Sequence, residues 1–135
     1  MTVRITLVVL AALLLSAVCF TDEPASDPAA EEGARLYEYY CKNCHGEKGV
    51  GDGPTATVLT VPPTDLTMLA RTNDGKFPLE RVTRNIDGRQ PSPAHGKEMP
   101  IWGLGFQDPS SDANQEQEVQ RRISALVAYL RTLQR

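Results

Sequence analysis

The segment YEYYCKNCHGEKG, residues 37–49, contains two cysteines and a histidine within one helical turn. Cys41 and Cys44 are three positions apart, and His45 follows at once. The apolar stripe that leads into them predicts a helix over residues 33–45. Residues at i and i+3 share one face of a helix, so both thiols should point the same way with the imidazole beside them.

Several chemistries use closely spaced thiols. A structural zinc site needs four ligands, and only His95 remains beyond this segment. A thioredoxin-type pair follows a strand, whereas this pair ends a helical pattern. A disulfide would close so small a loop that it would constrain the unfolded chain little. The pattern C-x-x-C-H is the signature of covalent haem attachment. Two thioethers from Cys41 and Cys44 and an axial imidazole from His45 account for all three side chains.

The first twenty residues predict export. Arg4 precedes an almost wholly apolar run over residues 5–20, which is typical of a secretory signal peptide. Cleavage after Cys19 would place two small residues at the recognised positions. An uncleaved membrane anchor and lipidation at Cys19 are alternatives, although the run is short for a span. We expect an exported, periplasmic protein, or one anchored in the membrane through residues 5–20.

Residues 21–32 are acidic and rich in proline and alanine, and we interpret them as a linker before a single domain at 33–135. That domain holds 12 acids against 13 lysines and arginines, which argues against nucleic acid as a partner. It is also poor in apolar runs. Small domains often need a metal or another aid to fold, so we expect a cofactor to fill the interior.

The remaining pattern is helical, with no strand signal. Residues 46–54 are loop, and an extended stretch from residue 60 ends in a turn capped by Thr64 or Asp65. Residues 78–88 predict a short helix and residues 89–112 another loop. A helix from about Asn114 to the end carries one apolar stripe, formed by Val119, Ile123, Leu126, Leu130 and Leu133.

A haem iron needs a second axial ligand. Met99, in GKEMPIWG, offers a soft thioether in a loop where no helical stripe requires it. Met68 is a rival, but it lies in an apolar turn and is better explained by packing against the ring. His95 is another rival, in a segment that we interpret as exposed loop. We favour Met99.

The ordered motifs GARLYEYYCKNCHG, GVGDGP, PPTDL, EMPIWG and ALVAYLRTL resemble those of a class I cytochrome c, of the small bacterial mono-haem type. The resemblance covers about residues 33–133. It implies an all-α cytochrome c fold in which crossing terminal helices, short helices and loops wrap one covalent haem c. The family positions of the crossing correspond here to Gly33, Tyr37, Leu126 and Tyr129.

The resemblance also implies roles for single residues. His45 and Met99 would be the axial ligands of the iron. Pro54 would accept the hydrogen bond of the proximal imidazole through its carbonyl, a contact that fixes ring orientation. Trp102 would hydrogen-bond a haem propionate, although ordinary core packing explains it equally well. Arg89 is a weaker propionate candidate, and we favour a solvated surface position for it.

The expected function is electron transfer without catalysis, with a dehydrogenase, an oxidase or another cytochrome as redox partner. The alternative is the same domain docked permanently on a dehydrogenase or oxidase complex. A five-coordinate haem enzyme or gas sensor needs an open iron site, which Met99 argues against. The loop side has a basic bias that comprises Lys76, Arg81, Arg84, Arg89 and Lys97. These charges would steer acidic partners, although a solvated face is the simpler interpretation.

Overall fold

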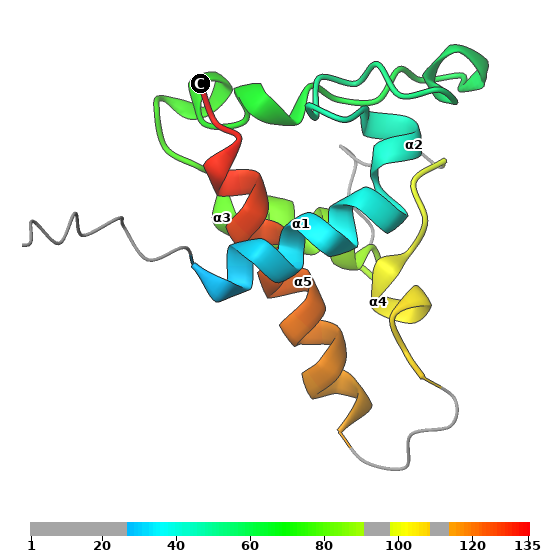
Figure 1. The fold of residues 1–135 in the computed structure, drawn as a ribbon, viewed down its shortest axis with the longest axis vertical. Helices are drawn as coiled ribbons and strands as arrows, with labels where there is room; N and C mark the ends of the chain where they lie inside the picture. The colour runs from blue at the N-terminus through cyan, green and yellow to red at the C-terminus, as the bar shows by residue number, and fades with distance from the viewer. Residues whose placement is uncertain (1–26, 91–97, 109–113) are drawn as a thin grey trace, which may run out of the picture.

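The computed structural model describes residues 27–90, 98–108 and 114–135, and within them every regular element is a helix. The predicted all-α class is therefore confirmed. Figure 1 shows the chain path. The five α-helices are α1 (Pro28–Tyr40), α2 (Lys42–His45), α3 (Leu79–Asp87), α4 (Trp102–Gly105) and α5 (Gln115–Thr132). The three short 3-10 turns are η1 (Ala56–Val58), η2 (Leu66–Met68) and η3 (Arg71–Asn73).

Helix α1 begins at Pro28 rather than at Gly33, inside the segment that composition predicts to be a linker. The Asp27 side chain accepts a hydrogen bond from the backbone N–H of Ala29 at 2.9 Å. Proline suits the first helical position because its ring presets φ and its missing N–H is not needed there. The capping residue and the proline thus start a helix that acidic composition alone does not reveal. The domain boundary itself stays a prediction.

The predicted helix over 33–45 is two helices. Cys41 interrupts it with φ −113° and ψ −32°, and α2 then carries the chain to His45.

The first and last helices cross at Gly33, as predicted (Figure 1). A Cβ added at Gly33 would lie 2.6 Å from the backbone carbon of Ala125 and 2.8 Å from Cβ of Tyr129. Glycine is thus required for the close approach of the two backbones. One turn further along α1, the ring of Tyr37 packs on that of Tyr129, with centroids 5.3 Å apart.

The core lies along one face of α5 and continues onto α3. The predicted stripe of α5 is buried except at its last member, Leu133, which is partly buried. Val82 and Ile86 of α3 pack against this face, whereas Leu79, at the start of α3, is 49% exposed. Gly88 ends α3 in the left-handed conformation, with φ 68°, as its position predicts.

Helix α4 was not predicted, because its sequence WGLG has two glycines and no apolar period. It is held instead by tertiary contacts. Phe106, directly after it, is 1% exposed and stacks on Trp102 with ring centroids 5.2 Å apart. The segment is therefore ordered by aromatic packing rather than by helix propensity.

Candidate functional site

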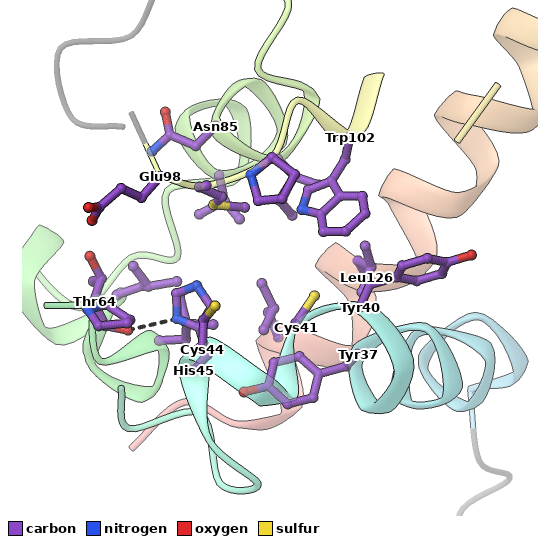
Figure 2. A pocket seen from close by; sticks show the side chains of 18 of the residues that line it. Tyr37, Tyr40, Cys41, Cys44, His45, Thr64, Asn85, Glu98, Trp102 and Leu126 are labelled. Atoms are coloured by element: carbon purple, nitrogen blue, oxygen red, sulfur yellow. Dashed lines mark hydrogen bonds between the residues drawn. The ribbon is translucent and has the colours of Figure 1, made fainter. Parts of the chain in front are cut away.

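A largely apolar cleft lies between α1 and α2 on one side and residues 98–102 on the other (Figure 2). Its empty volume is about 1120 Å³ when the solvent-open mouth is included. Leu126 and Leu130 of α5 and Val82 and Ile86 of α3 contribute apolar side chains to its lining. The lining also includes Tyr37, Tyr40, Cys41, Cys44, His45, Leu59, Val61, Pro62, Pro63, Thr64, Leu66, Leu69, Asn85, Glu98, Met99, Pro100 and Trp102.

The structure brings Cys41, Cys44 and His45 together on the α1–α2 side of this cleft (Figure 2). Cys41 and Cys44 form no disulfide with each other. Burial raises the pKa of the Cys41 thiol to about 12, with a smaller contribution from Cys44. The sulfur of Cys44 lies 3.2 Å from Oγ1 of Thr55.

A backbone carbonyl orients the ring of His45. Nδ1 lies 3.1 Å from the carbonyl oxygen of Thr64. A carbonyl only accepts hydrogen bonds, so Nδ1 carries the proton and donates it. In the neutral imidazole, which is the form that binds a metal, this leaves Nε2 as the nitrogen without a proton. A carbonyl partner of this kind also fixes the ring orientation of a metal ligand.

This carbonyl belongs to Thr64, whereas the resemblance assigns the role to Pro54. Pro54 is exposed and does not line the cleft. The loop after His45 folds back because the N–H of Gly51 donates to the carbonyl of His45 at 2.9 Å. Gly51, with φ 88°, then packs against the carbonyl of Pro63, where a side chain would overlap. The fold thereby brings residues 63–64 to the imidazole.

Met99 and Trp102 contribute to the other side of the cleft. Met99 is partly buried and packs against the core. Trp102 faces the cleft across from Cys41 (Figure 2) and makes an edge contact with Tyr40 at 5.1 Å between centroids. The aromatic contacts of Trp102 match the interpretation of ordinary packing, and its propionate role stays a prediction.

Met68 is absent from the described lining of this cleft. We expected it to pack against the ring, but Leu66 and Leu69 line the cleft instead. Residues three apart eclipse each other in a 3-10 turn, so Leu66 and Leu69 share a side that Met68 does not. His95 lies outside the described residues.

Arg89 is neither on the cleft nor a freely solvated cation. Its guanidinium donates to Asp87 at 2.8 and 2.7 Å and to Glu116 of α5 at 2.6 and 2.9 Å. These bonds lower the pKa of Asp87 and lower that of Glu116 to about 2. The network lies against Gly103 of α4, where an added Cβ would be 2.6 Å from Asp87 Oδ1. Arg89 therefore joins α3, α4 and α5.

A helical fold with a cleft that presents two cysteine sulfurs and an oriented imidazole is the arrangement expected of a c-type cytochrome domain. The profile of one family, described as cytochrome c oxidase, cbb3-type, subunit III, matches residues 28–109. The chain belongs to this family of c-type cytochromes. The match begins at the first residue of α1. Searches of curated proteins and of solved structures found no match.

The cofactor of this family is one covalent haem c with its iron, and the side chains of the cleft fit it. Cys41 and Cys44 would hold the porphyrin through two thioethers, and His45 would bind the iron through Nε2. The apolar lining supplies the burial that a porphyrin face requires. When bound, haem c supplies an iron that accepts and releases one electron. The domain is therefore an electron-transfer domain.

Proposed function

We propose that this chain is an exported electron carrier whose single haem c is six-coordinate, with His45 and Met99 as axial ligands. The observation that carries the proposal is the cleft itself, because His45 and Met99 line it from different segments. His45 ends α2. Met99 lies in the chain between Glu98 and Trp102, and both of these residues lie across the cleft from His45 (Figure 2).

A thioether ligand favours the carrier role. It raises the reduction potential of haem iron and occupies the position that a substrate or gas would need. The side chain of Met99 is partly buried against the core, so it has a defined place in the cleft. An enzyme or sensor with five-coordinate iron would require that position to be open.

Replacement of Met99 by alanine tests the ligand set. We expect the oxidised wild-type holoprotein to show the weak far-red band of sulfur–iron ligation. Met99→Ala should abolish this band and let the reduced protein bind carbon monoxide rapidly. Met68→Ala is the matched control, because Met68 does not line the cleft. Retention of the band in Met99→Ala would show that another group binds the iron.

A second candidate is a permanently docked electron-transfer subunit, and the family description, an oxidase subunit, favours it. Within the described residues no helix is long and apolar enough to span a membrane. Attachment would then depend on residues 5–20 or on a partner protein. Purification of the native chain from membranes and from soluble extract separates the two candidates. A stoichiometric partner supports the subunit, and recovery as a single soluble chain supports the carrier.

A further inference from the structure

The carboxylate of Glu98 joins two segments that are distant in the chain, and Val61 and Glu98 both line the cleft. Oε1 accepts a hydrogen bond from the backbone N–H of Thr60 at 2.9 Å. Oε2 accepts one from the N–H of Val61 at 3.2 Å. The partners are 38 and 37 residues away in the chain. Figure 2 shows Glu98 and Thr64 near each other at the same end of the cleft.

The segment that Glu98 holds has little structure of its own. Residues 59–65 form neither helix nor strand. Pro62 and Pro63 have no N–H, so they cannot donate to any neighbour. The two N–H groups directly before these prolines, those of Thr60 and Val61, are the ones that donate to the Glu98 carboxylate. These two hydrogen bonds connect the loop to residues 98–100. The two proline rings restrict the backbone between Val61 and Thr64, so fixing Val61 also restricts where Thr64 lies.

Both ends of this connection lead to a proposed iron ligand. On one side, the carbonyl of Thr64 accepts the Nδ1–H of His45 at 3.1 Å. On the other, Met99 directly follows Glu98 and precedes Pro100, which restricts the Met99 backbone to extended conformations. We propose that Glu98 is a positioning residue that fixes the Met99 segment relative to the His45 side of the cleft. This inference rests on the ligand set proposed above.

The geometry predicts which substitutions matter. An ionised carboxylate has two acceptor oxygens, and each serves one N–H here. Glu98→Gln keeps the length and one acceptor oxygen, so it should retain part of the connection. Glu98→Asp keeps the charge but is one methylene shorter, so it should lose the reach. Glu98→Ala removes both hydrogen bonds, to Thr60 and to Val61. Glu80→Gln is the control, because it removes the charge of another exposed glutamate, at the start of α3.

The experiment uses oxidised holoprotein and three readouts. They are the intensity of the far-red sulfur–iron band, the rate at which added imidazole displaces the native ligand, and hydrogen exchange of the Thr60 and Val61 amides. For Glu98→Ala and Glu98→Asp we expect a weaker band, faster amide exchange and imidazole binding faster by roughly tenfold, as expected for losing bonds to a charged acceptor. Glu98→Gln should be intermediate and Glu80→Gln unchanged.

Two results would overturn the proposal. If Glu98→Ala binds imidazole and exchanges its Thr60 and Val61 amides at the wild-type rates, the connection through Glu98 positions neither segment. A normal Glu98→Asp beside altered Glu98→Gln and Glu98→Ala would show that the charge matters and the reach does not. Absence of the band from wild-type protein would instead refute Met99 ligation, and the positioning role would fall with it. Failure of the positioning role and failure of Met99 ligation are thus distinguishable, because only the failure of Met99 ligation appears before any substitution at Glu98.

Discussion

Gly33→Ala tests whether the crossing of α1 and α5 limits the stability of the domain. Two effects of opposite sign compete at this position. Alanine is favoured over glycine inside a helix by about 1 kcal/mol. The added Cβ, however, would lie 2.6 Å from the backbone carbon of Ala125 and 2.8 Å from Cβ of Tyr129. Neither atom is the far end of a flexible side chain, so the helices themselves must separate.

Overpacking of this kind costs about 1–3 kcal/mol, and a backbone obstacle places Gly33→Ala near the upper end. Subtracting the helix-propensity gain leaves a net loss of about 2 kcal/mol in the free energy of unfolding. For a domain of about 100 residues, that corresponds to a fall in Tm of roughly 10 °C.

Thermal and guanidinium unfolding of the holoprotein, followed by circular dichroism, measures this loss. Ala34→Gly, at the next position of α1, serves as the control for helix propensity and should lose about 1 kcal/mol. The sign of the Gly33→Ala effect is decisive. An unchanged or raised Tm would mean that propensity outweighs the contact and that the two backbones are not closely packed there.

Two further predictions concern single buried or paired groups. Tyr37 donates its hydroxyl proton to the carbonyl of Gly46 at 2.7 Å in a buried position. Tyr37→Phe should therefore cost about 1–3 kcal/mol in the free energy of unfolding. The control Tyr39→Phe, at a residue that is 77% exposed, should change the free energy of unfolding by less than about 0.5 kcal/mol. The Arg89 guanidinium lowers the pKa of Asp87 in the folded state, so this carboxylate stabilises the fold above its unfolded pKa of about 3.9 and loses that contribution as the pH falls further. Denaturant midpoints measured from pH 6 to pH 3 should fall less steeply for Asp87→Asn than for wild type, and equal slopes would contradict the pairing.

Features that depend on neighbouring residues were readable from the sequence. Cys41, Cys44 and His45 lie within one turn, so their spacing alone predicts a shared face. The apolar period of α5 predicts its buried stripe, because every third or fourth residue of a helix returns to the same side. The crossing at Gly33 followed from the family resemblance.

Only the tertiary structure decided the contacts that join distant segments. The carbonyl that orients His45 belongs to Thr64, because the loop after residue 46 folds back on its glycines. Arg89 pairs with Glu116 across 27 residues, and Glu98 reaches Thr60 across 38. Local periodicity carries no information on such pairs, since they depend on how loops close. The sequence by itself therefore predicted where a haem would be attached, and the folding of the loops decided which groups surround that site.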